Sequence, residues 1–207
     1  MSAINPADVL AERYMLVQFS GCIGPQTKTD KGATDELLTT KSAAKGSAKA
    51  VKNIWAGADA EVKDLASIVG KARQLFYSMT MMYQNSTSRL LANEALLAEF
   101  IPAMAQAKKD MAAALVKFEV VYDQRVAQAM NNLGGLSEAS DYPSFAEYSR
   151  QCTMSYTFAP VPRSTHWRSV DMPAAAVDKL AEMTKRASEK AAGEAVREAV
   201  KRMIKPL

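Results

Sequence analysis

The residue types that most often carry out chemistry in proteins are scarce in this chain. His166 is the only histidine, and it stands beside Arg168 without a G-x-S-x-G or similar nucleophile motif. Cys22 and Cys152 are the only cysteines, and two distant cysteines with one histidine match no zinc-ligand spacing. We therefore expect no catalytic residues, no metal ion and no cofactor. An enzyme with an unrecognised carboxylate or metal site is the last of three alternatives.

Basic residues at helical spacing are the clearest candidates for binding. The first lysine row comprises Lys41, Lys45, Lys49 and Lys52. The second basic row comprises Lys179, Arg186, Lys190, Arg197 and Lys201. Side chains so spaced lie on one face of a helix, where they can contact phosphates without reading a base sequence, or bind an acidic protein. The alternative is a solvated helix face, which Glu182 and Glu198 partly neutralise through i,i+4 pairs.

The net charge of +4 is concentrated near the C-terminus. Residues 1–160 carry 16 basic and 16 acidic side chains, whereas residues 161–207 carry 10 basic and 6 acidic ones. This modest excess is compatible with nucleic acid or an acidic partner. The use of only two cysteines fits a reducing cytosol. The sequence has no secretory leader and no run of about 18 apolar residues, so we expect a cytoplasmic protein that does not enter a membrane.

An apolar seam at steps of three and four residues is the main structural signal. Its members are Leu37, Lys41, Ala44, Ala48, Val51, Trp55, Ala58, Val62, Leu65, Val69, Ala72, Phe76, Met79 and Tyr83, of which only Lys41 is charged. Such spacing keeps one stripe of a helix against a partner helix. It predicts a helix from about Ala33, a break near Gly57, and a second helix from Asp59 to Tyr83. The polar segment Gln26–Gly32 reads as a loop.

A second seam predicts another long helix, from near Asn93 to the pair Gly134-Gly135. Its members are Leu97, Phe100, Met104, Ala107, Met111, Leu115, Phe118, Tyr122, Val126, Ala129 and Leu133. Residues 84–88, between the two seams, are polar and typical of a turn. Two long seams joined by a short turn favour an antiparallel helical hairpin or coiled coil.

Two segments alternate like strands, Tyr14–Ile23 and Cys152–Phe158, and we expect them to pair with each other at the base of the hairpin. Ser144, followed three residues later by Glu147, predicts a short capped helix before the second strand. The segment from Pro173 to about residue 203 predicts a C-terminal helix. Its apolar face is mostly alanine, so we expect it to lean on a partner or to fray.

These elements predict a mainly α (α+β) fold. Its parts are a long antiparallel helical hairpin or coiled coil, a small two-stranded β element at the base, and the C-terminal helix. We divide the chain into a helical-hairpin domain with the β element, residues 1–170, and a C-terminal helical appendage, residues 171–207.

Several short motifs together are similar to a domain family of unknown function that occurs in tailed phages and prophages. They are Lys71-Ala-Arg-Gln-Leu-Phe-Tyr77, Arg89-Leu-Leu91, Phe100 with Met104, Leu133-Gly134, Asp141-Tyr-Pro143 and Phe158-Ala-Pro-Val-Pro162. The resemblance covers about residues 10–170 and implies a phage or prophage origin, hence the host cytoplasm. Members are often encoded near MoxR-type AAA+ ATPases, which implies such a partner. Ala92-Asn93 departs from the family, which usually has a proline there.

Two functions of different kinds follow from these features. The first is a non-catalytic helical scaffold or adaptor of a phage or prophage, which forms a homo-oligomer or docks on an AAA+ ATPase. The second is a sequence-independent DNA-binding protein of phage replication or recombination, which would use the two rows of basic residues.

Overall fold

The computed structural model describes residues 6–84, 87–163 and 173–204. They fold into two compact units, and each unit is built from separated stretches of the sequence. The first unit contains Met1–Ser20, Ala72–Ala105 and Ser155–Leu207, and the second contains Gly21–Lys71 and Gln106–Met154. Helices dominate and the sheets are small, which confirms the mainly α (α+β) class.

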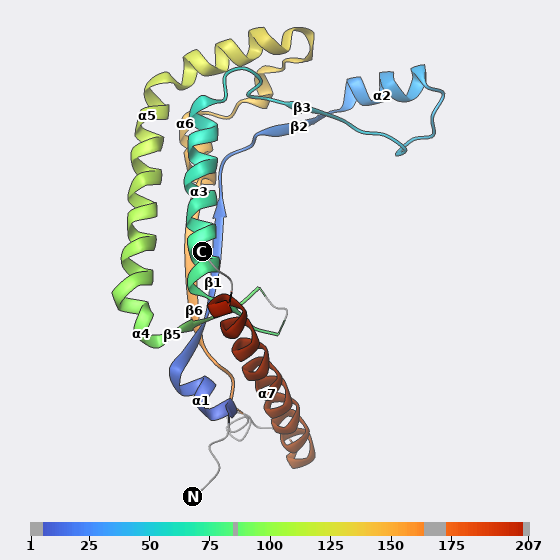
Figure 1. The fold of residues 1–207 in the computed structure, drawn as a ribbon. Helices are drawn as coiled ribbons and strands as arrows, with labels where there is room; N and C mark the ends of the chain where they lie inside the picture. Colours follow the sequence, from blue (N-terminus) through green and yellow to red (C-terminus); the bar gives the residue numbers. More distant parts are fainter. Residues whose placement is uncertain (1–5, 85–86, 164–172, 205–207) are drawn as a thin grey trace, which may run out of the picture. The chain divides into compact units, whose positions relative to one another are not determined.

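The described elements follow one another along the chain as labelled in Figure 1. The α-helices are α1 (Pro6–Arg13), α2 (Lys31–Thr40), α3 (Ala60–Met79), α4 (Asn93–Ala95), α5 (Ile101–Leu133), α6 (Phe145–Gln151) and α7 (Ala174–Ile204). A π-helical turn, Leu96–Phe100, joins α4 to α5, and 3₁₀ turns occupy Gly134–Leu136 and Ala139–Asp141. The strands are β1 (Tyr14–Cys22), β2 (Thr27–Asp30), β3 (Ala50–Asn53), β4 (Met81–Met82), β5 (Arg89–Ala92) and β6 (Thr153–Pro160).

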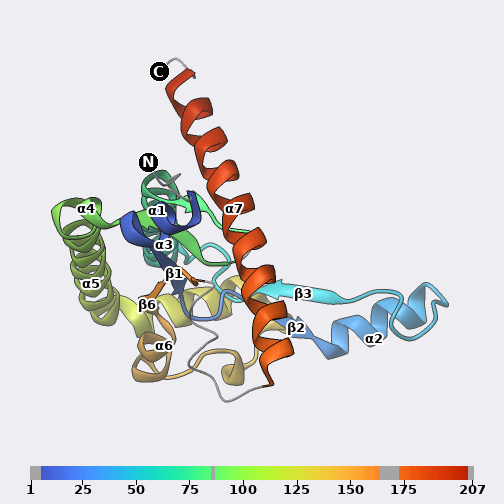
Figure 2. The same cartoon turned by 90° about the horizontal axis from the view of Figure 1, so that it is seen from below.

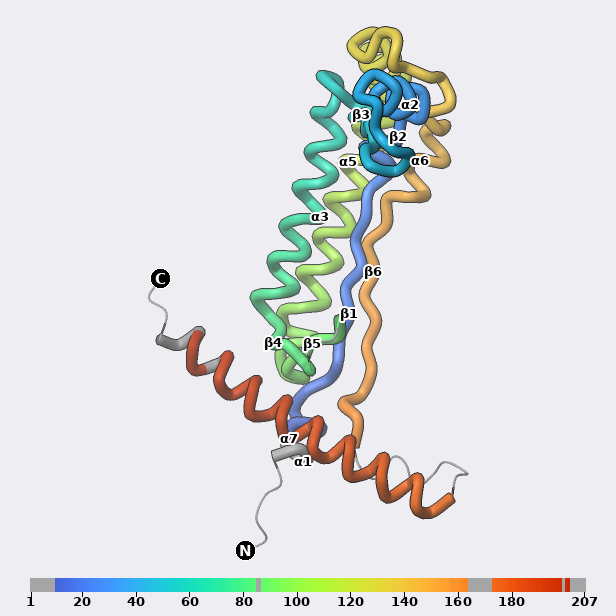
Figure 3. The backbone as a smooth tube through the Cα atoms, turned by 90° about the vertical axis from the view of Figure 1, so that its right-hand side faces the viewer, coloured from blue at the N-terminus to red at the C-terminus, as the bar shows by residue number. Residues whose placement is uncertain are grey.

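A four-stranded sheet with the order β4-β5-β1-β6 organises the first unit. Strand β6 lies beside β1, so the predicted pairing of these two strands is confirmed (Figure 3). The expected two-stranded element is nevertheless too small. Strand β5 pairs antiparallel with β1, placing Tyr14 opposite Ala92, and β4 pairs antiparallel with β5. Strand β4 has only two residues and β5 only four, so both are too short for an alternating pattern to be visible in the sequence.

Apolar side chains fill both sides of this sheet. One cluster consists of Val17, Phe76, Leu91, Phe100 and Met104, all buried, with Phe19 stacked on Phe76 at 5.6 Å between ring centroids. The other consists of Leu10, Leu16, Tyr83, Leu90 and Val161, together with three alanines of α7, namely Ala191, Ala192 and Ala195. The two predicted helical seams therefore supply buried residues to this unit, as their spacing indicates.

Helix α7 was expected to need a partner, and that expectation is wrong. Its alanine face packs inside the first unit, where Ala191 is fully buried and Ala195 is 5% exposed. Helix α1 lies against it (Figure 2). Alanine is a weak core residue by area, but its small side chain lets α7 approach closely, and larger residues from the sheet fill the space. The domain boundary predicted at residue 170 lies outside the described residues.

Trp55 is at the centre of the second unit. It is fully buried, and four aromatic rings surround it with centroids 5.6–5.7 Å away, those of Phe118, Tyr122, Tyr142 and Tyr148. Their mutual geometry is edge-to-face, which the ring quadrupoles favour. From Trp55 onward the first seam is buried as predicted, apart from the partly buried Met79, and most of the second is at least partly buried. Leu97 is the exception, because it lies in the π-helical turn and is 75% exposed.

Helices α3 and α5 run side by side in opposite directions (Figures 1 and 3). In the second unit the carboxylate of Glu61 on α3 accepts two hydrogen bonds from the guanidinium of Arg125 on α5, at 2.8 and 2.7 Å. The Asn132 amide also donates to the carbonyl oxygen of Ala56 at 2.8 Å. These contacts place the N-terminal end of α3 beside the C-terminal half of α5.

The predicted helix through residues 41–55 does not form. Helix α2 ends at Thr40, and the chain returns as β3, which pairs antiparallel with β2 so that Lys28 faces Lys52. The backbone at Ser42 and Gly46 has positive φ values of 48° and 89°, which a right-handed helix cannot accommodate. The predicted loop at 26–32 is also wrong, since it contains β2. Asp30 ends that strand and caps α2 by accepting the Ala33 N–H at 2.9 Å.

Candidate functional site

The first lysine row lies on an extended arm of the second unit and not on a helix face. We call residues 27–53, which comprise β2, α2, the connecting turn and β3, the lysine arm (Figure 1). Lys41, Lys45 and Lys49 fall in the turn between α2 and β3, and all three are exposed. Residues 41–49 contain no acidic residue. Because this turn is not helical, the three lysines do not share a helix face, but their ammonium groups still lie within nine consecutive residues.

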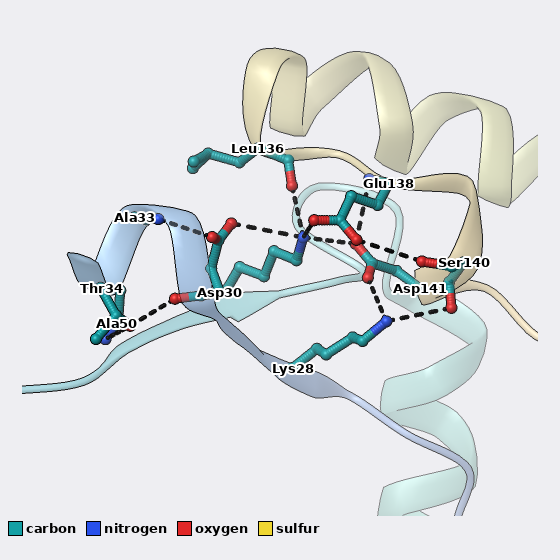
Figure 4. Close-up of polar contacts among 10 residues, drawn as sticks. Lys28, Asp30, Ala33, Thr34, Ala50, Leu136, Glu138, Ser140 and Asp141 are labelled. Carbon is teal, nitrogen blue, oxygen red and sulfur yellow. Dashed lines mark hydrogen bonds and ion pairs between the residues drawn. The ribbon is translucent and has the colours of Figure 1, made fainter. Parts of the chain in front are cut away.

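Lys52, the fourth member of the row, has a different role, because it is buried at the base of the arm. Figure 4 shows the side chains of Lys28, Asp30, Glu138 and Asp141 that gather there. Its ammonium lies 2.7 Å from Oδ2 of Asp141 and 3.6 Å from Oδ2 of Asp30, and it donates to the carbonyl oxygen of Leu136 at 2.7 Å. Lys28, on the opposite strand, approaches Oδ1 of Asp141 at 2.8 Å. Lys52 is therefore not available to an external ligand.

The electrostatic interactions in this cluster favour the charged forms of Lys52 and Asp141. The hydrogen bond to Asp141 raises the pKa of Lys52 above its ordinary value, and burial opposes this effect without cancelling it. Burial alone would raise the pKa of Asp141, but the ammonium groups of Lys28 and Lys52 together hold that pKa below its ordinary value. The pair is thus ionised on both sides at neutral pH, and its charges are used to anchor the arm to residues 136–141.

The second basic row lies on the exposed face of α7, as its spacing predicts. Its five members, Lys179, Arg186, Lys190, Arg197 and Lys201, are all exposed. Arg186 pairs with Glu182 at 2.8 Å, and Lys190 pairs more loosely with Glu194 at 3.9 Å. Arg197 donates to the carbonyl oxygen of Gly193 at 3.2 Å. The face is basic but partly neutralised, so the solvated-face alternative stays open beside the binding one.

The two cysteines, far apart in sequence, come to the same place in the second unit. The thiol of Cys22 donates to the carbonyl oxygen of Gln151 at 3.0 Å, and the Gly24 N–H donates to the sulfur of Cys152 at 3.2 Å. Both thiols are free, and burial raises the pKa of Cys152. Among the described residues, no three His, Cys, Asp or Glu side chains are grouped so that they could hold a metal ion. His166 lies outside the described residues.

A groove runs between α3 and α5 in the second unit and was not predicted. It has a volume of about 470 Å³. Its apolar surface includes Ile68, Ala113 and Ala114. Five charged residues also line it. Glu61 is paired with Arg125, whereas Asp64 and Lys71 on α3 and Asp110 and Lys117 on α5 are all exposed. Outside the groove lining, α5 exposes two large apolar side chains, Val116 at 63% and Val120 at 83%.

The sequence contains a signal for this groove, although a search for seams overlooks it. Val116 and Val120 are four residues apart, so they share a helix face, and neither belongs to the seam that includes Phe118. Asp64 and Lys71, and likewise Asp110 and Lys117, are spaced by seven residues and therefore also share a face. Polar spacing at the heptad interval outside the core stripe is the pattern that indicates a second contact surface. No sequence pattern marks the pairing of Lys52 with Asp141, because it depends on how residues 136–141 fold back on the arm.

In the part of the chain that the structure describes, no helix is both long enough and apolar enough to span a bilayer. Comparison with known proteins adds no information on the fold or the sites. No family model matches the chain, and neither a curated protein nor a solved structure does so.

Proposed function

We propose that the protein is a non-catalytic helical scaffold that associates with itself through the helices of its second unit. The observation that supports this proposal is the pair Val116 and Val120, exposed by 63% and 83% on one face of α5. Single exposed apolar residues are common on protein surfaces. Two large exposed valines one turn apart on the same face of a helix are typical of a surface that another helix covers.

The charged residues at the base of the lysine arm support a structural role. Asp141 and Asp30 both lie within ion-pair distance of Lys52, and Asp141 is also paired with Lys28. A carboxylate that acts as a general acid or base needs access to a substrate, whereas these carboxylates hold the chain in place. We therefore assign a structural, supporting role to the second unit.

The antiparallel coiled-coil hairpin that the two seams predict is part of this proposal. Val62, Leu65 and Val69 of α3 are buried at heptad-like steps, and so are Met111 and Phe118 of α5. The AAA+ ATPase partner and the phage or prophage origin, both implied by the resemblance to the phage family, also belong to it. A rod of two helices offers a long surface to partners, which suits an adaptor.

The experiment that tests the proposal measures molar mass in solution. We expect size-exclusion chromatography with light scattering, and sedimentation equilibrium, to give a dimer or a larger closed assembly at tens of micromolar protein. Mixing with a MoxR-type ATPase, the partner class that the resemblance implies, tests the adaptor role in the same instruments. A chain that stays monomeric over this range and leaves the ATPase profile unchanged would refute the scaffold function.

A second candidate function, sequence-independent binding to DNA, is favoured by the exposed turn of the lysine arm. Lys41, Lys45 and Lys49 lie within nine residues that contain no acid. Ammonium groups on a projecting loop can contact phosphates, and the affinity would then fall steeply as salt rises. Fluorescence anisotropy with a labelled duplex at several salt concentrations measures this. Reversing these three charges should abolish binding, whereas reversing Lys179, Arg186, Lys190 and Arg197 tests the α7 face separately.

A further inference from the structure

The two edges of the four-stranded sheet differ in how they are protected. Edge strands expose backbone N–H and C=O groups that could pair with another chain, and proteins commonly shorten, charge or cover such edges. At one edge, β4 has only two residues, and the Met82 N–H donates to Oε2 of Glu198 on α7 at 3.0 Å. At the other edge lies β6, and among the described residues no further strand pairs with it (Figure 3). The sheet is therefore covered at β4 and open at β6.

The open edge lacks the sequence features that discourage strand pairing. We call Ser155–Pro160, the part of β6 that belongs to the first unit, the β6 edge. It contains no Lys, Arg, Asp or Glu, and its proline is the last residue of the strand. Thr157 and Ala159 are exposed. Every second residue of such a strand directs its backbone groups away from the sheet, so the β6 edge can accept an added strand.

Aromatic rings hold the β6 edge in its extended form. The ring centroids of Tyr156 and Phe158 are 5.5 Å apart, and they lie 5.5 and 5.9 Å from that of the buried Phe100. A segment that already has the conformation needed for binding loses little further freedom when a partner arrives. The β6 edge is thus preorganised for pairing.

A small pocket lies at the C-terminal end of the β6 edge. Its volume is about 360 Å³, and Phe158, Ala159 and Pro160 line it together with Tyr14 and Met15 of β1. None of the described residues that line it is charged. The volume is near the lower limit for ligand pockets, which suits an apolar side chain better than a large cofactor.

We propose that the β6 edge binds an extended segment of a different protein, which adds a strand to the sheet and places an apolar side chain in this pocket. In this mode of recognition, backbone hydrogen bonds supply affinity and the side-chain pocket supplies specificity. The proposal goes beyond self-association, because it uses the first unit and a strand edge instead of the helices of the second unit.

A second copy of the chain would fit this edge less well. Antiparallel pairing of two β6 strands places the start of one strand beside the end of the other, where the pocket lies. The residues at that start are Thr153, Met154 and Ser155. Met154 is buried in its own copy, with 8% exposure, and the other two side chains are small and polar. A second copy would leave the pocket empty, whereas a foreign segment can fill it.

Selection from a display library of random linear peptides on the immobilised full chain supplies the probe. A selected peptide is then synthesised in two further forms, one N-methylated at its odd residues and the other at its even residues. Because successive N–H groups of a strand point to opposite sides, only one of these forms can pair with β6. We expect fluorescence anisotropy to show that one methylated form binds like the parent peptide and that the other does not bind.

Ala159→Glu tests the pocket. Ala159 is exposed and lines the pocket, so a carboxylate there would meet the apolar side chain of the peptide. We expect the dissociation constant of the unmethylated peptide to rise about tenfold or more. Ala105→Glu is the matched control, because Ala105 is exposed in the first unit and does not line the pocket. Circular dichroism checks that both variants keep their helices.

The possible results separate the occupants of the edge. Failure to recover any binding peptide, equal binding by both methylated forms, or an unchanged dissociation constant in Ala159→Glu would overturn the proposal. A smaller molar mass of Ala159→Glu in sedimentation equilibrium would also overturn it, because the edge would then hold a second copy. A monomeric chain that binds peptide as expected would support the β6 edge as a binding surface and refute self-association.

Discussion

The ammonium of Lys52 on β3 lies 2.7 Å from Oδ2 of Asp141, and the two side chains are only 4% and 0% exposed. A buried ion pair contributes little beyond a well-packed apolar pair, but removing one partner leaves the other charge buried without its main counter-ion. We therefore expect Asp141→Ala to lower the free energy of unfolding by about 3 kcal/mol, measured by urea denaturation.

Two further variants distinguish the loss of a buried counter-ion from the loss of side-chain contacts in general. Lys28→Ala removes a partly exposed ammonium from the same carboxylate, and it should cost less than about 1 kcal/mol. Lys52→Met with Asp141→Leu removes both charges and should recover most of the stability lost in Asp141→Ala. An Asp141→Ala protein as stable as the wild type would show that the pair does not anchor the arm.

Stability should depend on pH through the same carboxylate. The pKa of Asp141 is lower in the folded protein than the value of about 3.9 expected in the unfolded chain. Its contribution is therefore fully present above about pH 5, begins to decrease as the pH approaches about 3.9, and is lost as the pH falls through the folded-state pKa. Thermal unfolding followed by circular dichroism should give a falling Tm below about pH 4.5. In Asp141→Asn this fall should be shallower, and equal slopes in the two proteins would contradict the assignment.

The docking of α7 should depend on its alanine face. Ala191 is fully buried among apolar residues, so Ala191→Glu would bury a carboxylate without a partner. We expect a loss of roughly 3 kcal/mol and release of α7 to limited proteolysis. Val196→Glu is the matched control on the same helix, since Val196 is 63% exposed, and its effect should stay within about 0.5 kcal/mol. Equal protease resistance in the two variants would refute the packing of α7.

Two glycines should respond in opposite ways to alanine. A Cβ at Gly24 would overlap the ring of Tyr148, which belongs to the aromatic cluster around Trp55. Gly24→Ala should therefore destabilise the second unit strongly. A Cβ at Gly70, inside α3, meets no atom within 4 Å, and Gly70→Ala should stabilise by about 1 kcal/mol through helix propensity. Differential scanning calorimetry of the two variants measures both changes, and shifts of the same sign would contradict this comparison.

The parts of the fold that could be predicted from sequence are those with long periodic patterns or explicit capping residues. The seam from Trp55 through Phe76 is buried and lies on α3 from Val62 onward, and the break at Gly57 falls where the backbone has a φ of 71°. The capping box of Ser144 and Glu147 forms at the start of α6, with the Ser144 hydroxyl 2.8 Å from the Glu147 carboxylate. In these places local preference and tertiary packing agree.

The lysine arm could not be predicted because its composition is misleading. Alanine and lysine between residues 41 and 50 favour a helix locally, and the seam appears to continue through them. The hairpin forms because a left-handed turn at Gly46 returns the chain, and because Lys52 and Lys28 meet Asp141, far along the sequence. The groove was missed for a related reason. Its apolar residues are few and small, so the charges at heptad spacing carried the only signal.

The division of each unit among separated stretches of sequence has a consequence for synthesis. On the ribosome, the second unit has all of its residues once position 154 has left the exit tunnel, while the first unit still lacks α7. Premature termination after residue 154 and before α7 would therefore leave the first unit incomplete while the second unit has all of its residues. A nascent chain thus completes the second unit before it completes the first.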